Sequence, residues 1–378
     1  MVLILKRWIA ALCLLLSLTA LTAPQSAAAE TAAESLILYE PRSGTVLCEK
    51  NADTPRLVAS TTKIMTALVV LERCALRERV TATAAHAAVE GSSMYLRPGE
   101  CYTVEELLYG LLLASGNDAA AALADYCAGS MEAFAALMNE KCAELGLHNT
   151  HFANAHGLDA TDHYSSARDL ALITAAAMKN PDFCRIFSTR SYSCKGMTYV
   201  NHNRLLADYD GCIGGKTGYT NAAGRVLVSC AERDGLRLIC VTVSDPDDWA
   251  DHTALYDEAF AAYRYLALPG SGWERLNLVS GTSGFVRLIC DVPGLVVPKT
   301  AELRMTVRLP RFAFAPTVFG TAVGAVEIST DGATPRTIPI CIAETVSLDR
   351  TAPLSVWEKF KRAWFTANRY SGIYYMAY

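Results

Sequence analysis

The sequence lacks an excess of charge of either sign, and it lacks long low-complexity runs. Its 378 residues include 34 Lys and Arg against 38 Asp and Glu, a net charge of −4, and 52% are hydrophobic. This balance leaves no basic surface of the kind that binds nucleic acid, and the composition is that of a folded protein rather than a disordered one. At this length the sequence predicts two domains rather than one.

Cysteine is plentiful, but C-x-x-C pairs are absent. The 13 cysteines are scattered along the chain, so neither a zinc site nor a thioredoxin-like motif is indicated, and no metal or cofactor is expected. Cys230 and Cys240 lie on two predicted neighbouring strands, where an exported chain could form a disulfide. We expect mostly free thiols, because a chain this long can bury a core without cross-links and cysteine often packs as a small hydrophobe.

The first 29 residues have the order of a secretory signal. Two basic residues, Lys6 and Arg7, precede an apolar run that ends near Leu21, and three alanines follow. This order, with an Ala-x-Ala pattern at its end, predicts a signal peptide at 1–29 that is cleaved after Ala29. An uncleaved membrane anchor is the alternative, but the apolar run is short for a membrane span.

The rest of the chain divides by composition. Residues 30–268 combine a hairpin pattern at 35–51, a block of helices, a strand pair at 224–245 and a final helix at about 251–266. That order predicts an α+β domain, an antiparallel sheet with helices packed on it. After a break rich in Pro and Gly, short strand patterns predict a small all-β domain over 272–348.

The last segment, 353–378, has a pattern of its own. Leu354, Trp357, Phe360 and Trp364 recur at three- and four-residue spacings, with Lys and Arg on other faces. Such a pattern is typical of an amphipathic helix that lies in the interface of a membrane. We therefore expect a membrane-associating tail helix, and a helix packed on the β domain is the alternative.

A serine and a lysine stand three residues apart in the stretch LVASTTKIMTALVVLER, at 57–73. Residues at i and i+3 share one face of a helix. A serine hydroxyl becomes a nucleophile when a base takes its proton, and a lysine can be that base when burial makes its neutral form accessible. Taken alone, Ser60 and Lys63 are more often a helix cap and a lysine that extends to solvent.

Two further motifs favour a catalytic role for this serine and lysine. Ser115-Gly116-Asn117 lies at a break between two helical patterns, and Lys216-Thr217-Gly218 opens a strand-rich stretch. S-x-x-K, S-x-N and K-T-G each occur once, in the order found in penicillin-binding proteins and class A β-lactamases, where the middle motif is S-D-N. A phosphate-binding loop ending at Thr217 is excluded, because its first glycine would be Asp210.

On these motifs the chain resembles the serine-type D-alanyl-D-alanine carboxypeptidases, low-molecular-mass penicillin-binding proteins of the β-lactamase-like transpeptidase superfamily. The resemblance spans about residues 34–348 and includes GSSMYLRPGE at 91–100, HGLDATDHYSSARDLALI at 156–173 and GGKTGYTNAAG at 214–224. It implies a transpeptidase-like fold, removal of the terminal D-alanine from peptidoglycan stem peptides, covalent binding of β-lactams and no cofactor. Together with the tail, it implies a place on the outer face of the cytoplasmic membrane.

The resemblance also implies roles for individual residues. Ser60 is the expected nucleophile, Lys63 its base and Ser115 a proton relay to the leaving group. The residues expected to contact substrate are Asn117, Lys216, Thr217, Gly218 and Tyr219, the last through a backbone N–H that faces the oxyanion with that of Ser60. His156 is a candidate accessory residue, with a structural hydrogen bond as the alternative.

Two departures leave alternatives open. Many relatives carry an arginine before the final helix that helps to hold the substrate carboxylate, but DPDDWADHTALYDEAF at 245–260 has none, and His252 is the candidate substitute. The E-x-x-L-N pattern, whose glutamate serves class A β-lactamases, is also missing, and Glu144 lies at a predicted helix end. The alternatives are a β-lactamase and a catalytically silent wall-binding protein of the same fold.

Overall fold

The structure of the protein is a computed structural model that describes residues 31–267, 275–290, 294–330, 336–349, 359 and 373–377. Contacts divide these residues into two compact units. The first contains 31–267 and 294–300, and the second contains 275–290 and the described residues after 300. The signal peptide predicted at 1–29 lies outside the described residues.

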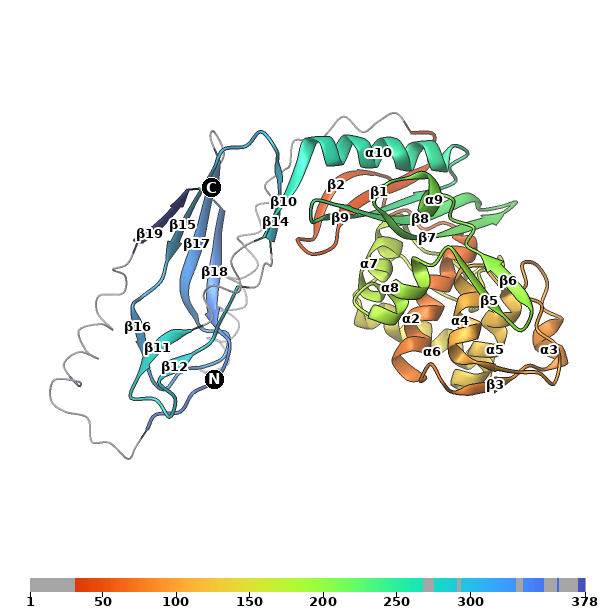
Figure 1. The fold of residues 1–378 in the computed structure, drawn as a ribbon, viewed down its shortest axis with the longest axis horizontal. Helices are drawn as coiled ribbons and strands as arrows, with labels where there is room; N and C mark the ends of the chain where they lie inside the picture. Colours follow the sequence, from red (N-terminus) through yellow and green to blue (C-terminus); the bar gives the residue numbers. More distant parts are fainter. Residues whose placement is uncertain are drawn as a thin grey trace. The chain divides into compact units, whose positions relative to one another are not determined.

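An antiparallel sheet of five strands, in the order β2-β1-β9-β8-β7, organises the first unit (Figure 1). The predicted hairpin supplies β1 and β2, and the last three strands are joined by short turns, so each pairs with the next. β7 carries the K-T-G motif at the edge of the sheet, where no other strand of the described residues pairs with one side of its backbone. The strands are β1 (Ser35–Glu40), β2 (Thr45–Lys50), β7 (Cys212–Thr220), β8 (Gly224–Arg233) and β9 (Leu236–Val243).

Helices cover both faces of this sheet. Figure 1 shows α10 along one face and α2, α7 and α8 against the other. Alternate residues of β8 therefore enter two separate cores: Val226 and Val228 pack with α2, and Leu227 packs with α10. The helices are the 3-10 helix η1 (Ala59–Thr62), α2 (Lys63–Arg73), α3 (Ala84–Ala87), α4 (Val104–Leu112), α5 (Asn117–Ala128), α6 (Met131–Glu144), α7 (Ala167–Ala177), α8 (Pro181–Phe187), α9 (Leu205–Asp208) and α10 (Asp248–Ala262).

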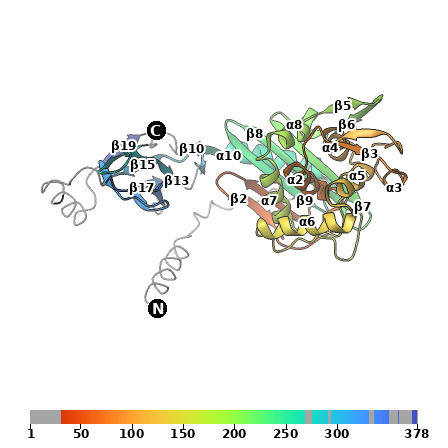
Figure 2. The same ribbon diagram turned by 90° about the horizontal axis from the view of Figure 1, so that it is seen from below.

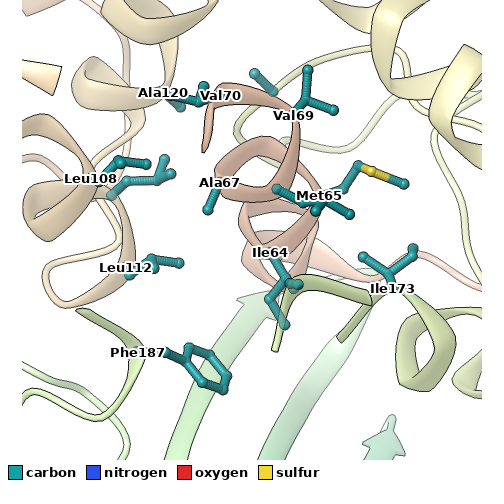
Figure 3. Packing of buried hydrophobic residues seen from close by; sticks show 14 of the residues in the cluster. Ile64, Met65, Ala67, Val69, Val70, Leu108, Leu112, Ala120, Ile173 and Phe187 are labelled. Atoms are coloured by element: carbon teal, nitrogen blue, oxygen red, sulfur yellow. The ribbon is translucent and has the colours of Figure 1, made fainter. Parts of the chain in front are cut away.

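Helix α2 lies at the centre of the larger core. Figure 3 shows its apolar residues surrounded by side chains of α4, α5, α7 and α8, including Leu108, Ala120, Ile173 and Phe187. A helix packed on all sides is apolar around its whole circumference, and every residue from Lys63 to Val70 is buried. The lysine at its first turn is consequently held in an apolar surrounding.

Two small antiparallel pairs extend the helical side of this unit, and a third follows α10. The first two are β3 with β4 and β5 with β6. The third pairs β10, which directly follows α10, with β14. Residues 294–300 therefore belong to the first unit, although they come after the predicted domain boundary near Pro269. These strands are β3 (Arg79–Thr81), β4 (Cys101–Thr103), β5 (Ser191–Cys194), β6 (Met197–Val200), β10 (Tyr263–Ala267) and β14 (Gly294–Pro298).

Three local expectations differ from the structure. Ser60 lies in η1, one turn ahead of α2, rather than inside the longer helix. The final helix is α10, Asp248–Ala262, and the residues after it are extended because they pair with β14. For the same reason residues 294–300 cluster with the domain predicted at 30–268 and not with 272–348.

The second unit consists of strands in the part of the chain that the structure describes (Figure 2). Its sheets have the orders β12-β11-β16 and β13-β18-β17-β15-β19. The last strand, Ile373–Ala377, lies in the segment where we predicted a helix, and apart from Lys359 the rest of that segment lies outside the described residues. The strands are β11 (Leu276–Val279), β12 (Phe285–Val286), β13 (Leu288–Cys290), β15 (Leu303–Arg308), β16 (Phe312–Phe314), β17 (Ala322–Thr330), β18 (Arg336–Ile342) and β19 (Ile373–Ala377).

The register of β8 and β9 excludes a disulfide between Cys230 and Cys240. The two strands are neighbours, as predicted, but Cys230 is opposite Ile239 and Cys240 is opposite Ser229. Cys230 belongs to the core on the α2 face and Cys240 to the core on the α10 face. Their side chains thus point away from each other, and all ten cysteines at 31–267 are free thiols.

Candidate active site

The lysine of the first motif contacts the serine of that motif and the asparagine of the second. Lys63 Nζ lies 2.9 Å from Ser60 Oγ and 2.7 Å from Asn117 Oδ1. It also lies 2.5 Å from the carbonyl oxygen of His156. Lys63 and Asn117 are the first residues of α2 and α5, so the start of each helix faces this point.

The partners of Lys63 decide which way its protons point. Asn117 donates from Nδ2 to the Glu90 carbonyl at 2.7 Å, which turns its Oδ1 toward the lysine. An amide oxygen and a carbonyl oxygen can only accept hydrogen bonds. A neutral amine has two N–H groups for these two oxygens, and its lone pair is then left to accept the Ser60 hydroxyl proton.

Burial favours that neutral form. Lys63 has no exposed surface, and desolvation, followed by the repulsion of the Lys216 ammonium, holds the pKa of Lys63 well below its ordinary value. The Asp118 carboxylate opposes this shift. Loss of hydration penalises a charged amine strongly, so the site meets the condition that we set for a lysine to act as a base.

The third motif supplies a second buried amine. Lys216 lies on β7 opposite Val228, a residue of the core on the α2 face, so its side chain enters the same side of the sheet as Lys63. Its Nζ donates to the Thr217 carbonyl at 2.7 Å. Desolvation lowers the pKa of Lys216 to about 7. An anion bound beside this amine would favour its protonated form.

A buried carboxylate absent from our predictions organises the second motif. Asp118 accepts hydrogen bonds from the backbone N–H groups of Met94 and Leu96, at 2.9 and 3.0 Å, and from the Ser93 hydroxyl at 2.6 Å. The backbone N–H of Asn117 donates to the Ser92 carbonyl at 2.7 Å. The 91–100 block is therefore fixed to the start of α5, next to the asparagine that contacts Lys63. The sequence feature that could have revealed this role is an aspartate directly after the S-x-N motif, at the start of a helix.

Hydroxyl groups of η1 and α2 hold the loop between α6 and α7 in place. Thr66 Oγ1 donates to the Ala155 carbonyl at 2.7 Å, and Thr62 Oγ1 lies 2.8 Å from His163 Nε2. These bonds position the carbonyl of His156, which is the group that Lys63 contacts. The His156 ring accepts from the Leu158 N–H at 3.2 Å, and burial, with Lys63, lowers its pKa to about 4. A structural hydrogen bond therefore accounts for His156 better than an accessory role in catalysis does.

Unusual backbone conformations flank the reactive residues. Ala59 and Ser115 have φ values of 48° and 58°, in the left-handed region that residues other than glycine rarely adopt. Each costs on the order of 1–3 kcal/mol and persists where the surroundings over-determine it. Ala59 precedes the serine, and Ser115 lies in the turn that leads into Asn117, so both strained residues belong to the motifs that meet here.

Two glycines allow other chain segments to approach Ser60. A Cβ added to Gly157 would lie 2.0 Å from the Ala59 carbonyl oxygen, and one added to Gly218 would lie 3.1 Å from the Ser60 nitrogen. The loop after His156 and the K-T-G strand thus both press against the backbone of residues 59–60. Tyr219, the next residue on β7, has a side chain that is 65% exposed.

The structure contradicts His252 as a carboxylate ligand. Its ring is fully buried between α10 and the sheet, 2.7 Å from Ser229 Oγ and 3.1 Å from Thr242 Oγ1. Ser229 and Thr242 face the α10 side, the opposite face from Lys216. Burial lowers the pKa of His252 to about 3. The histidine is a neutral core residue that bridges two hydroxyl groups.

No group of His, Cys, Asp and Glu among the described residues is arranged to hold a metal ion. None of the helices that the structure describes has the length and apolar character needed to cross a bilayer.

We predict that Gly157→Ala displaces Ser60, because the new methyl group would overlap the Ala59 carbonyl. Gly129→Ala is the matched control: its φ of +85° is close to the +87° of Gly157, but nothing lies within 4 Å of its Cβ position. The control should lose about 1–2 kcal/mol of unfolding free energy from backbone strain alone. Gly157→Ala should lose more, and its crystal structure should show Ser60 Oγ out of contact with Lys63 Nζ. Equal losses and an unchanged contact would refute this reading.

Comparison with known proteins identifies the family. A family model described as D-alanyl-D-alanine carboxypeptidase matches residues 21–247. The chain is 33% identical over 355 residues to D-alanyl-D-alanine carboxypeptidase DacF of Bacillus subtilis, an alignment that covers 87% of this chain and 91% of that protein. It is 43% identical over 220 residues to D-alanyl-D-alanine carboxypeptidase DacA of Escherichia coli, covering 55% of each.

Solved structures agree with this result. Penicillin-binding protein 5 from Haemophilus influenzae superposes with a TM-score of 0.74 at 28% identity, over 84% of this chain and 98% of that one. The sequence motifs, the fold of the first unit and the arrangement around Lys63 point the same way. This chain belongs to the D-alanyl-D-alanine carboxypeptidase family of serine peptidases.

Proposed function

We propose that the chain is a serine carboxypeptidase that removes the terminal D-alanine from peptidoglycan stem pentapeptides, with Ser60 as the nucleophile. Family membership gives the reaction class. The observation that carries the residue assignment is the 2.9 Å contact between Ser60 Oγ and the buried amine of Lys63, whose other two partners can only accept hydrogen bonds. A hydroxyl beside such an amine has a base at hydrogen-bonding distance, which a serine nucleophile requires.

In this mechanism Lys63 takes the proton of Ser60 as Oγ attacks the carbonyl of the penultimate D-alanine. The tetrahedral intermediate collapses, the terminal D-alanine leaves with a proton on its nitrogen, and an acyl-enzyme remains on Ser60. Ser115 relays that proton to the leaving nitrogen. Water then hydrolyses the ester and restores the serine. Lys63 is neutral again after the first half, because the proton from Ser60 has left with the D-alanine. In the second half it takes a proton from the attacking water and returns it to Ser60 Oγ as the ester bond breaks.

The oxyanion and the carboxylate need separate partners. We assign the oxyanion to the backbone N–H groups of Ser60 and Tyr219, which is supported by the close approach of Gly218 to the Ser60 nitrogen. Loss of one such donor typically costs on the order of 100-fold in turnover. With His252 excluded, Lys216 and the Thr217 hydroxyl are the groups that we assign to the substrate carboxylate, and Asn117 holds the substrate amide.

The two alternatives have less support. A β-lactamase of class A needs a glutamate that activates water, and Glu144 is an exposed residue of α6 paired with Lys141. Asp118 is buried, and its oxygens are occupied by backbone and hydroxyl donors. A silent wall-binding protein would have no need for a fully buried lysine against a serine, an arrangement that costs desolvation energy.

We further propose that the protein acts outside the cytoplasm, at the membrane surface. The order of basic residues, apolar run and alanines at 1–29 supports export. The aromatic and basic pattern of the tail, before Ile373, supports attachment through an interfacial helix. Since β19 occupies Ile373–Ala377, the tether that we propose is the segment at 353–372 rather than the whole tail.

We predict that Ser60→Ala lowers the rate of D-alanine release from a stem pentapeptide by at least about 1,000-fold, as loss of a serine nucleophile does in other enzymes. The same change should abolish covalent labelling by a fluorescent penicillin. Ser188→Ala removes an exposed hydroxyl at the end of α8 and is the control, which should keep both activities.

Mapping of the labelled peptide in the unaltered protein separates the candidate functions. A long-lived adduct on Ser60 supports the carboxypeptidase, whereas rapid turnover of penicillin supports the β-lactamase. An intact, correctly folded chain with neither label nor D-alanine release would support the silent protein and overturn the proposal.

We predict a bell-shaped pH profile of kcat/KM for the peptide. Lys63 must be neutral to act as a base, so the rate falls as the pH drops below its lowered pKa. Lys216 must be cationic to hold the carboxylate, so the rate falls as the pH rises through its pKa of about 7 in the free enzyme. The quantity kcat/KM reports the ionisations of the free enzyme.

Lys216→Gln tests the alkaline limb of this profile. The variant should have a lower kcat/KM that no longer declines above pH 7. Its acid limb should move to higher pH, because loss of the Lys216 ammonium removes a repulsion that lowers the pKa of Lys63. An alkaline limb that is unchanged in the variant would show that another group causes it, and would remove Lys216 from its role.

We predict that polar replacement of the apolar face of the tail releases the protein from membranes. The variant carries Ser at Leu354, Trp357, Phe360 and Trp364, which keeps β19 in place. The control carries Ser at exposed apolar residues of the first unit, Val200 and Tyr126. The tail variant should remain in the supernatant on sedimentation with vesicles of anionic lipid and should keep its penicillin labelling. Sedimentation equal to that of the control would exclude the interfacial tether.

A further inference from the structure

Two cysteines of the first unit are hydrogen-bonded to each other through their thiols. Cys74 lies directly after α2, and Cys127 lies in the last turn of α5. Their side chains form a hydrogen bond with each other, and both are half-buried at the edge of the larger core. No function assigned above uses either thiol. The helices α2 and α5, at whose ends the two cysteines lie, also contact each other.

The pair occupies a particular place relative to the reactive residues. Helix α2 begins at Lys63 and ends one residue before Cys74, and α5 begins at Asn117 and ends one residue after Cys127. The first residues of the two helices are joined by the 2.7 Å hydrogen bond between Lys63 Nζ and Asn117 Oδ1. The thiol pair joins their last turns. Eleven helical residues span about 16 Å, so the thiols lie far from the chemistry.

The surroundings make one thiol the more reactive of the two. The hydrogen bond from the Cys74 thiol lowers the pKa of Cys127 to about 7, and the Arg73 guanidinium assists, while burial and Glu78 oppose the shift. The same hydrogen bond raises the pKa of Cys74. The thiolate is the nucleophile in thiol–disulfide exchange, and a thiol with a pKa near the ambient pH attacks most effectively.

We propose that Cys74 and Cys127 form a disulfide by exchange with an organic disulfide, and that the bond joins the ends of the two helices that begin in the active site. Cys127 as thiolate attacks one sulfur of the oxidant and releases the first thiol. Cys74 then loses its proton, attacks the Cys127 sulfur of the mixed disulfide and releases the second thiol. Two protein thiols and one organic disulfide give one protein disulfide and two small thiols, with the electrons passing to the oxidant.

The expected consequence is stability rather than a change of mechanism. The bond would close a loop of about 50 residues, and cross-links of that length restrict the unfolded chain strongly. For a domain of this size we expect the melting temperature of the first unit to rise by roughly 5 °C or more. Penicillin labelling of Ser60 should be retained, since the contacts of Lys63 stay in place.

The experiment treats the full chain with oxidised glutathione or with a reductant, blocks the remaining thiols and maps the linked peptides by mass spectrometry. Digestion after Arg and after Glu separates Cys127 from Cys101, which would otherwise share a peptide. The melting temperature is measured in both states. Cys74→Ser and Cys127→Ser are the test variants. Cys101→Ser is the control, because that half-buried thiol accepts a hydrogen bond from Arg79 instead of from a cysteine.

The expected result is a linked pair of peptides that contain Cys74 and Cys127, with a redox-dependent melting temperature that both test variants lose and the control keeps. In Cys74→Ser, glutathione should stay attached to Cys127. Linkage of other cysteines, or two thiols that both stay free or separately glutathionylated, would overturn the proposal. Because the readout does not involve D-alanine release, it can fail without bearing on the proposed enzyme.

Discussion

The site depends on one interaction, the placement of a fully buried lysine with a lowered pKa against a serine hydroxyl at the edge of an apolar core. Water does not stabilise a charge on Lys63, which is fully buried. Its amine forms hydrogen bonds with the Asn117 side chain, the His156 carbonyl and the Ser60 hydroxyl. The second amine, Lys216, reinforces the neutral form by repulsion. Removal of any of the three hydrogen-bond partners of Lys63 would leave its buried amine with an unmade hydrogen bond, which costs about 1–3 kcal/mol.

Much of the surrounding structure serves to hold those partners. Asp118 fixes the 91–100 block to the start of α5, and the hydroxyls of Thr62 and Thr66 fix the loop that carries the His156 carbonyl. Strained backbone at Ala59 and Ser115 is retained because these neighbours leave no relaxed alternative. The free energy that such strain and burial cost is offset by the large core around α2, which is apolar on all sides (Figure 3).

Sequence reasoning succeeded where a feature depends on neighbours along the chain. The hairpin of β1 and β2 and the strand pair β8 and β9 follow from short-range patterns. It failed where distant pairing overrides local preference. The end of the predicted final helix became β10 because β14 returns to pair with it, and the end of the tail became β19 beside β15.

By itself the sequence determined the order of the three motifs, the class of reaction and the two residues that we propose as nucleophile and base, because these reside in residue types at fixed spacing. Only the tertiary structure decided which groups meet. It showed that the carbonyl of His156, and not its ring, faces the lysine, and that His252 belongs to the opposite face of the sheet. It also brought Cys74 next to Cys127 across more than fifty residues. The physical reason is that burial and the direction of a side chain are set by the elements packed around it, which no local pattern encodes.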